Sequence, residues 1–162
     1  MQSIVESLPP EIAIIALAAL PVIELRGAVP LGLALGVHPV EVYLLAVVGN
    51  MLPIPLVYQL LVPVRRRLST SPAVRRFIDR YLDRLLQRSA AIAKYGFWGL
   101  VVFVAVPLPG TGAWTGAIAA SLLGMRFRPA VVALTLGTML AGVAVLLLSF
   151  LGGLGVQALL AP

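Results

Sequence analysis

Two charged side chains, Glu24 and Arg26, lie two residues apart inside the apolar run Ile12–Val37 and are its only charges. A charged side chain at the centre of a bilayer costs roughly 2.5–3.5 kcal/mol on insertion scales, so such residues usually serve a function. Burial favours the neutral form of a carboxyl group, which could make Glu24 a proton carrier or leave it as a static partner of Arg26. A guanidinium group suits phosphate or carboxylate. The alternative is a pair near a helix end whose side chains reach the headgroups.

A second stretch, Pro107–Gly116, carries no charge but is rich in proline, glycine and threonine. A half-helix that begins at such a break points free N–H groups and its positive dipole end at an anion, and glycine permits close backbone approach. Packing of small residues between helices explains the glycines equally well. The candidate substrate-binding residues are Glu24, Arg26, Gly27, Asn50, Pro109, Gly110, Thr111, Gly112, Trp114 and Thr115. For Asn50 and Trp114, a structural role is an equal alternative.

The composition of the chain is that of an integral membrane protein. Of its 162 residues, 60% are hydrophobic and 11% are charged, whereas soluble domains carry about 25% charged residues. The net charge is +6, and nine of the 12 basic residues fall between Arg65 and Lys94. In a membrane protein this clustering indicates orientation and contact with anionic lipid rather than nucleic-acid binding. With no cysteine and one histidine, His38, we find no catalytic or metal set and expect neither an enzyme nor a cofactor.

Three segments are predicted as continuous helices. The apolar runs 40–64 and 130–151 are long enough to cross the ~30 Å membrane core, the first with a kink at its prolines. Residues 72–95 place apolar side chains on one helical face and basic ones on the other, which predicts an amphipathic interfacial helix. The positive-inside rule puts this helix in the cytoplasm.

The remaining apolar runs, 12–37 and 96–124, are broken by prolines and glycines that make poor continuous helices. We predict each as a re-entrant hairpin of two half-helices. The first tip would lie at Glu24–Gly27, because residues two apart diverge on a helix and only a non-helical tip would let both charges face one cavity. The second tip would lie at Pro107–Gly112. In the rival topology, 12–37 spans the membrane and the N-terminus is inside.

The two halves of the chain resemble each other. His38-Pro39 leads to Gly49-Asn-Met-Leu52, and Arg128-Pro129 leads to Gly137-Thr-Met-Leu140. The sequence thus predicts an all-α integral membrane protein with an inverted repeat of two units, each a re-entrant hairpin plus a transmembrane helix, joined by the cytoplasmic amphipathic helix. Inverted repeats whose broken segments meet near the midplane are common in transporters.

Two motifs resemble the signatures of the small multi-drug export family: Glu24-Leu-Arg-Gly-Ala-Val-Pro-Leu-Gly32 and Pro107-Leu-Pro-Gly-Thr-Gly-Ala-Trp-Thr-Gly-Ala117. The resemblance covers nearly the whole chain. That family is similar to, and grouped with, the DedA superfamily. The resemblance implies two inverted re-entrant hairpins and lipid-carrier or proton-coupled transport, with Glu24 as the acidic site of the first hairpin. Typical DedA proteins carry arginines in the second hairpin, and Pro107–Ala117 has none, which weakens the case for a lipid phosphate.

We therefore expect a multi-pass protein of a prokaryotic cell membrane that transports or flips an anionic amphiphile such as a lipid phosphate, with proton coupling as an option. The first alternative is a small multidrug or cation exporter with Glu24 as the coupling residue. A structural or partner-binding membrane protein is a further alternative. Two hairpins and two spanning helices barely enclose a path, so we expect a homodimer surrounded by membrane lipids and no nucleic-acid partner.

Overall fold

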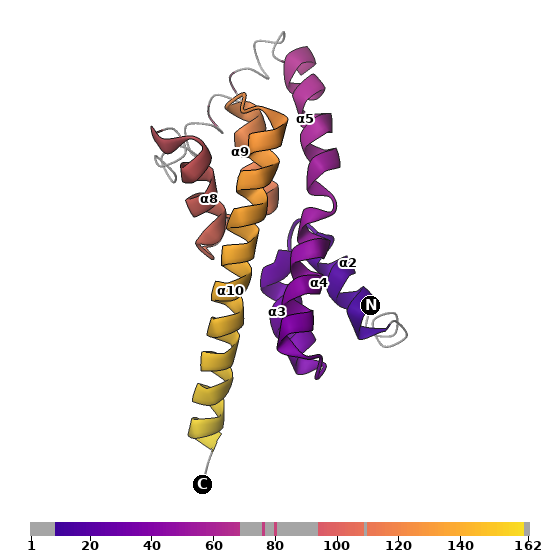
Figure 1. Ribbon diagram of the computed structural model, residues 1–162, viewed down its shortest axis with the longest axis vertical. Helices are drawn as coiled ribbons and strands as arrows, with labels where there is room; N and C mark the ends of the chain where they lie inside the picture. Colours follow the sequence, from indigo (N-terminus) through magenta and orange to yellow (C-terminus); the bar gives the residue numbers. More distant parts are fainter. Residues whose placement is uncertain (1–8, 69–75, 77–79, 81–93, 109, 161–162) are drawn as a thin grey trace.

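The structure, a computed structural model, describes residues 9–68, 76, 80, 94–108 and 110–160. Every regular element in these residues is an α-helix, which confirms the predicted all-α class. The helices are α2 (Pro10–Ala19), α3 (Glu24–Ala34), α4 (Pro39–Met51), α5 (Ile54–Leu68), α8 (Phe97–Ala105), α9 (Ala113–Leu122) and α10 (Phe127–Leu160), as Figure 1 shows. Nearly all of the amphipathic helix predicted at 72–95 lies outside the described residues.

The break in the first apolar run occupies Leu20–Ile23, which we call tip 1, and α3 begins at Glu24. The prediction of a non-helical tip at Glu24–Gly27 is therefore wrong. Pro21 lacks a backbone N–H and interrupts the helical ladder, and Glu24 takes a φ of 51°, in the left-handed region that few residues with side chains adopt. Gly27 is already inside the helical ladder, because its N–H donates to the Ile23 carbonyl at 3.2 Å.

The break in the second apolar run lies where the sequence predicts it. Helix α8 ends at Ala105 and α9 begins at Ala113, so residues 106–112, which we call tip 2, join them. Within each helix–tip–helix pair the two helices pack against each other in opposite directions. A Cβ placed on Gly32 of α3 would meet Ile14 of α2, and one placed on Gly116 of α9 would meet Val104 of α8.

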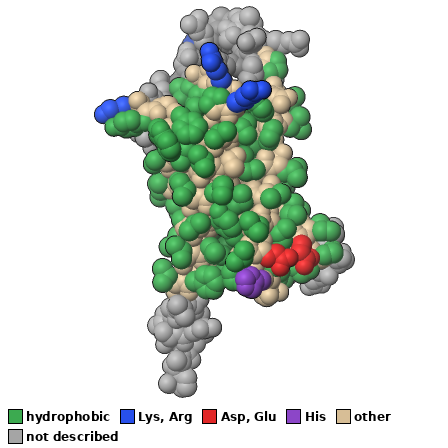
Figure 2. Space-filling view, viewed as in Figure 1, with side chains coloured by type: hydrophobic (Ala, Val, Ile, Leu, Met, Phe, Trp, Pro, Cys, Tyr) green, Lys and Arg blue, Asp and Glu red, His purple; other side chains and the backbone are tan. Residues whose placement is uncertain are grey.

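Two segments are long and apolar enough to cross a membrane: Pro39–Leu61, which combines α4 with the first part of α5, and Phe127–Gly152 of α10. Exposed large hydrophobic side chains recur along the first segment at every fourth residue: Val40, Leu44, Val48, Leu52, Leu56 and Leu60. Figure 2 shows hydrophobic side chains over the middle of the visible face, with basic side chains at one end and acidic and histidine side chains towards the other. A continuous exposed apolar surface of this kind faces lipid, and the chain is a membrane protein.

The segment α4–α5 runs antiparallel to α10 (Figure 1). The Tyr43 hydroxyl, near the start of α4, donates at 3.2 Å to the Met139 carbonyl, about a third of the way along α10. The Tyr58 hydroxyl, in α5, donates at 2.5 Å to the Met125 carbonyl, just before α10. Moving forward along one segment therefore means moving backward along the other, and the acidic start of α4 lies at the opposite end of the molecule from the arginines that begin α10.

The two halves share a pattern of buried positions when Gly36 is aligned with Gly124. Every buried residue of α3 and α4 then falls on a buried residue of the second half. The pairs are Glu24 with Gly112, Leu25 with Ala113, Ala28 with Gly116, Val29 with Ala117, Gly32 with Ala120, Val42 with Ala130, Ala46 with Leu134, Gly49 with Gly137 and Asn50 with Thr138.

The ends of α3 and α9 share one capping geometry. Gly36 has a φ of 79° and Gly124 a φ of 71°, and each follows the last helical turn as the left-handed residue of a helix C-cap. The next N–H reaches back to the helix in both cases, from Val37 to the Gly32 carbonyl at 3.2 Å and from Met125 to the Ala120 carbonyl at 3.0 Å. The similarity of the halves thus extends from burial to backbone hydrogen bonds.

Candidate functional site

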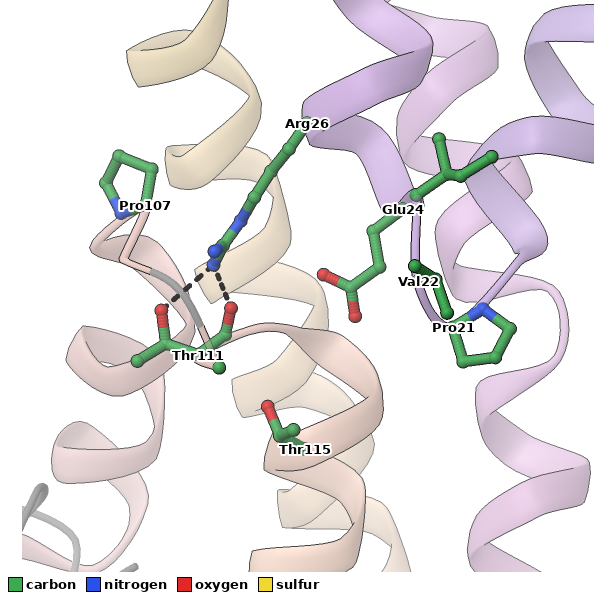
Figure 3. A pocket seen from close by; sticks show the side chains of 9 residues that line it. Pro21, Val22, Glu24, Arg26, Pro107, Thr111 and Thr115 are labelled. Atoms are coloured by element: carbon green, nitrogen blue, oxygen red, sulfur yellow. Dashed lines mark hydrogen bonds between the residues drawn. The ribbon is translucent and has the colours of Figure 1, made fainter.

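Tip 1 and tip 2 meet around a partly open pocket of about 470 Å³. Residues of both tips and of the helices that follow them line it: Pro21, Val22, Ile23, Glu24, Arg26, Pro107, Gly110, Thr111 and Thr115. In Figure 3, Arg26 extends from α3 to Thr111, and the Glu24 carboxyl group points into the space between the same two tips. The pocket therefore joins the two halves of the chain.

The guanidinium group of Arg26 fastens α3 to tip 2. Its Nη1 donates to the Leu108 carbonyl, and its Nη2 donates to both the carbonyl and the hydroxyl of Thr111, the latter at 2.9 Å. These acceptors belong to irregular backbone that lacks the hydrogen bonds of a helix. Hydrogen bonds from a charged donor are roughly twice as strong as neutral ones, so Arg26 satisfies and orders tip 2.

The hydroxyl of Thr111 is the centre of tip 2. Its Oγ1 lies 2.7 Å from the Val106 carbonyl and 2.8 Å from the Leu108 carbonyl, and it accepts the Leu108 N–H at 3.2 Å. A hydroxyl has one proton to donate and two lone pairs to accept with, so it donates to one carbonyl at a time while accepting from Arg26. Thr111 thus holds the tip in the shape that receives the guanidinium group.

The carboxyl group of Glu24 lies against the start of α9. Its side chain is 7% exposed, and its Oε1 accepts the backbone N–H of Trp114 at 3.3 Å. A Cβ placed on Gly112 would overlap the carboxyl group, with Oε1 at 2.7 Å. A carboxylate at this place satisfies a free N–H of the first helical turn and interacts favourably with the positive end of the helix dipole. Glu24 therefore caps a helix of the other half.

Glu24 and Arg26 form no direct ion pair with each other in the described structure; each side chain binds the opposite tip instead. Arg26 uses three N–H donors on tip 2, and a guanidinium group has five. The pocket thus combines one carboxyl group, one guanidinium group with two further donors, and the hydroxyl groups of Thr111 and Thr115. Within the described residues, no group of three or more histidine, cysteine or acidic side chains could hold a metal ion.

The structure brings most of the predicted site residues together. Glu24, Arg26, Gly110, Thr111 and Thr115 line the pocket, and Gly112 and Trp114 contact Glu24 through their backbone positions.

Two predicted residues stand apart from the pocket lining, and a third cannot be placed. Gly27 packs on Ile23, since a Cβ there would overlap the Ile23 side chain. Asn50 is buried in α4 and does not line the pocket. Pro109 lies outside the described residues. The indole Nε1 of Trp114 is buried without a hydrogen-bond partner in the described structure, so the ring is a packing residue here and the backbone N–H makes the polar contact.

The sequence reasoning missed four lining residues: Pro21, Val22, Ile23 and Pro107. All four lie in tip 1 or tip 2, and the first three directly precede Glu24. The proline that interrupts the helix before the charged residues was the available signal, because a break at Pro21 places tip 1 before Glu24 rather than after it.

Comparison with known proteins supports the family resemblance that the two sequence motifs, Glu24–Gly32 and Pro107–Ala117, indicate. Residues 24–144 match the family described as "Putative small multi-drug export protein". No curated protein and no solved structure matches the chain significantly. The matched segment begins at Glu24, extends through tip 2 and ends within α10, so it includes the two charged residues of the pocket and tip 2 but not tip 1. The chain therefore belongs to the small multi-drug export family.

Proposed function

We propose that the chain is a membrane transporter that carries an anionic amphiphile, such as a lipid phosphate, through the pocket between tip 1 and tip 2. The observation that carries this proposal is Arg26, a guanidinium group that lines the pocket and keeps two N–H donors beyond those it uses on tip 2. Guanidinium binds phosphate and carboxylate through paired hydrogen bonds. The family description, which speaks of export, supports a transport role.

The membrane arrangement that accompanies this function is an inverted repeat. Each unit consists of a re-entrant hairpin, α2–α3 or α8–α9, and a spanning segment, α4–α5 or α10. The matching buried positions, the shared C-caps and the antiparallel course of α4–α5 and α10 support it. The same layout would relate the family to the DedA superfamily. With the basic end in the cytoplasm, the first hairpin enters from outside and the second from inside a prokaryotic cell membrane.

In this mechanism the bonds between Arg26 and tip 2 act as the closed barrier between the two sides. An anionic headgroup that enters the pocket competes with the carbonyls of Leu108 and Thr111 for the guanidinium group. Ionic acceptors bind guanidinium more strongly than neutral carbonyls do, so the substrate loosens tip 2 and lets the tips separate. Alternating access then follows from movement of one hairpin relative to the other. No bond of the substrate is broken in this mechanism, so the proposal needs no enzymatic step.

Reconstitution into vesicles tests this proposal. We expect Arg26→Ala to abolish translocation of a fluorescent lipid phosphate, whereas Arg128→Ala, which removes an exposed arginine at the start of α10, leaves it unchanged. A neutral lipid of the same chain length serves as the second control. Translocation by Arg26→Ala at the wild-type rate contradicts the assignment of Arg26 as the substrate-binding group.

A second candidate function is proton-coupled export of lipophilic cations. The observation that favours it is Glu24, a buried carboxyl group in the pocket, together with the family description. Vesicles with an imposed proton gradient should then accumulate a lipophilic dye cation. Glu24→Gln keeps the shape and the acceptor for the Trp114 N–H but cannot lose a proton, so coupled accumulation should stop. Loss of lipid-phosphate translocation in Arg26→Ala with no cation uptake in wild type excludes this candidate.

A homodimer would complete the transport path. Val22 of tip 1 is 91% exposed and Pro21 is exposed beside it, although irregular backbone at membrane depth is tolerated only against protein or a water-filled cavity. A second copy that covers tip 1 meets this requirement, with membrane lipids around the pair and no role for nucleic acid. Cross-linking at Val22→Cys in membranes should yield a dimer, while Val132→Cys on the exposed face of α10 should not.

A further inference from the structure

Two buried polar side chains, Asn50 of α4 and Thr138 of α10, lie outside the pocket and make no hydrogen bond in the described structure. Asn50 is 1% exposed and Thr138 is 0% exposed, and neither the Nδ2 and Oδ1 of Asn50 nor the Oγ1 of Thr138 has a partner. Each buried polar atom without a partner costs about 1–3 kcal/mol. Because buried polar groups are nearly always hydrogen-bonded, we expect a further group to bind these atoms.

Other hydroxyl groups of α10 avoid this cost within their own helix. The Thr135 hydroxyl donates to the Val131 carbonyl at 2.9 Å, and the Ser149 hydroxyl donates to the Val145 carbonyl at 2.8 Å. Thr138 has the same option one turn back, yet its hydroxyl makes no such bond. Its hydroxyl group is therefore available to a group outside the helix.

The packing register brings the two side chains to about the same level of α4 and α10. A Cβ on Gly142 would meet Tyr43 and Val47, and the ring of Tyr58 lies 5.7 Å from that of Phe127. Between these two contacts, the part of α10 opposite residue 50 is the turn that runs from residue 135 to residue 138.

The helical faces agree with this register. Asn50 follows Tyr43 and Val47 at spacings of seven and three residues, and Thr138 precedes Gly142 by one turn, so each lies on the face of its helix that meets the other segment.

Their level in the molecule is that of the two tips. Gly49 packs on Ala18, next to the last residue of α2, and Gly137 packs on Val104, next to the last residue of α8. Tip 1 begins directly after the last residue of α2, and tip 2 begins directly after the last residue of α8. Asn50 and Thr138 also correspond to each other in the alignment of the halves, as do Glu24 and Gly112, which touch. Both pairs thus lie where the two halves meet.

We infer that Asn50 and Thr138 form an internal water-binding site between α4 and α10, at the level of the pocket. The pair offers two oxygen atoms, one amide NH2 and one O–H, a mixture of donors and acceptors that matches water, which binds buried sites through two to four such groups. A metal cation would need about six oxygen ligands, and the NH2 group would repel it. Water at this level hydrates the membrane interior beside Glu24 and provides a route for protons to its carboxyl group; this last step rests on the proposed function.

The natural chain contains no cysteine, so single cysteines report hydration without background. We expect Asn50→Cys and Thr138→Cys, in lipid vesicles, to react with a small water-soluble methanethiosulfonate at least about tenfold faster than controls in dry surroundings, where the reactive thiolate is suppressed. The matched controls are Ala46→Cys and Leu134→Cys, buried one turn earlier in each helix. Equal rates at all four positions would show that the site is dry and overturn the inference.

A double variant tests the register by itself. Asn50→Cys combined with Thr138→Cys should be joined by a short bis-methanethiosulfonate, whereas Val42→Cys combined with Thr138→Cys, two turns away along α4, should not. If neither pair is joined, the two side chains do not face each other and the shared site is wrong. If the first pair is joined but the single cysteines react no faster than their controls, the two positions face each other across a dry contact and the water site is wrong.

Near-isosteric apolar variants test the use of the water. If the polar groups are only tolerated, Asn50→Leu and Thr138→Val should be as stable as the wild type or more so, with unchanged transport. If the water serves Glu24, these variants remain folded while gradient-driven transport falls at least about tenfold, which corresponds to 1.4 kcal/mol. A wild type that transports nothing refutes the proposed function, and the cysteine rates still decide whether the site is hydrated.

Discussion

Tip 1 and tip 2 occupy matching places in the two halves but contribute opposite chemistry. Tip 1 is short, and the helix after it supplies the two charged side chains, Glu24 and Arg26. Tip 2 is longer and supplies carbonyls and one hydroxyl group, and the helix after it, α9, supplies the free N–H of its first turn. Each charge of the first half is therefore completed by neutral backbone of the second.

This difference follows from how the halves meet. Glu24 and Gly112 correspond in the alignment and are also in contact. A second glutamate at position 112 would place two carboxyl groups in one space, and two carboxylates that share a site cannot both stay ionised. Matching positions that touch in this way therefore cannot both carry an ionised carboxyl group, and glycine at position 112 leaves the room that the Glu24 carboxyl group occupies.

The strongest way to break this complementarity is Arg26→Ala. It leaves the carbonyls of Leu108 and Thr111 without their donor and removes the positive charge near Glu24. Because hydrogen bonds to a charged group contribute about 1.5–3 kcal/mol each, we expect a loss of at least about 3 kcal/mol in the free energy of unfolding, measured by thermal or denaturant unfolding in detergent. Arg26→Lys keeps the charge but not the fork of donors and should recover only part of the loss. If Arg26→Ala is as stable as the wild type, tip 2 keeps its shape without the hydrogen bonds from Arg26.

Gly112→Ala should have the next largest effect, because the added Cβ overlaps the Glu24 carboxyl group. The φ of 169° at Gly112 is extended and suits alanine, so the cost comes from the contact alone. We expect about 1–3 kcal/mol, the range for overpacking, in unfolding measurements. In the Glu24→Ala background the same change should cost much less, with a coupling energy of about 0.5–3 kcal/mol.

Gly152→Ala is the control for this cycle, since a Cβ at Gly152 meets nothing within 4 Å. If Gly112→Ala costs the same with and without the Glu24 carboxyl group, the contact between the matching positions carries no energy.

The sequence predicted the chemistry of the two tips better than their geometry. Charges inside an apolar run and prolines inside apolar runs are visible as residue types, so the all-helical class, the second break and most lining residues followed from them. The position of tip 1 was missed although Pro21 marks it, and the left-handed φ of Glu24 was not visible in the sequence. Nor was the contact of the Glu24 side chain with α9, which joins residues 90 positions apart. Nor did the sequence reveal that Arg26 binds backbone rather than Glu24, since backbone acceptors leave no mark in the residue pattern.

Thr138 was missed for a related reason. A threonine in a membrane helix usually satisfies its hydroxyl group within the helix, as Thr135 does, so its residue type gave no signal. Only the packing of α10 against α4 distinguishes the two threonines.

Thr111→Val tests whether the shape of tip 2 depends on one hydroxyl group. The change keeps the size of the side chain but removes the acceptor of Arg26 and the donor to the Val106 or Leu108 carbonyl. We expect unfolding measurements to show a loss of about 1–2 kcal/mol, the cost of a bonded group left without its partner. Thr135→Val removes a hydroxyl group with a single bond inside its own helix and should cost less. Equal losses would mean that the Thr111 hydroxyl has no special place in tip 2.

The smallest expected effects come from two tyrosine hydroxyl groups, one towards each end of the antiparallel contact between α4–α5 and α10. Tyr58 is buried, and its hydroxyl donates at 2.5 Å to the Met125 carbonyl in the loop that follows α9. Tyr43 is half-buried, and its hydroxyl donates at 3.2 Å to the Met139 carbonyl. A bond in a buried place contributes about 1 kcal/mol, whereas lipid headgroups or water can replace one near the surface. Tyr58→Phe should therefore lower the free energy of unfolding by about 1 kcal/mol and Tyr43→Phe by less. The reverse order would place the firmer link between the halves at the start of α4, away from the hairpin that carries tip 2.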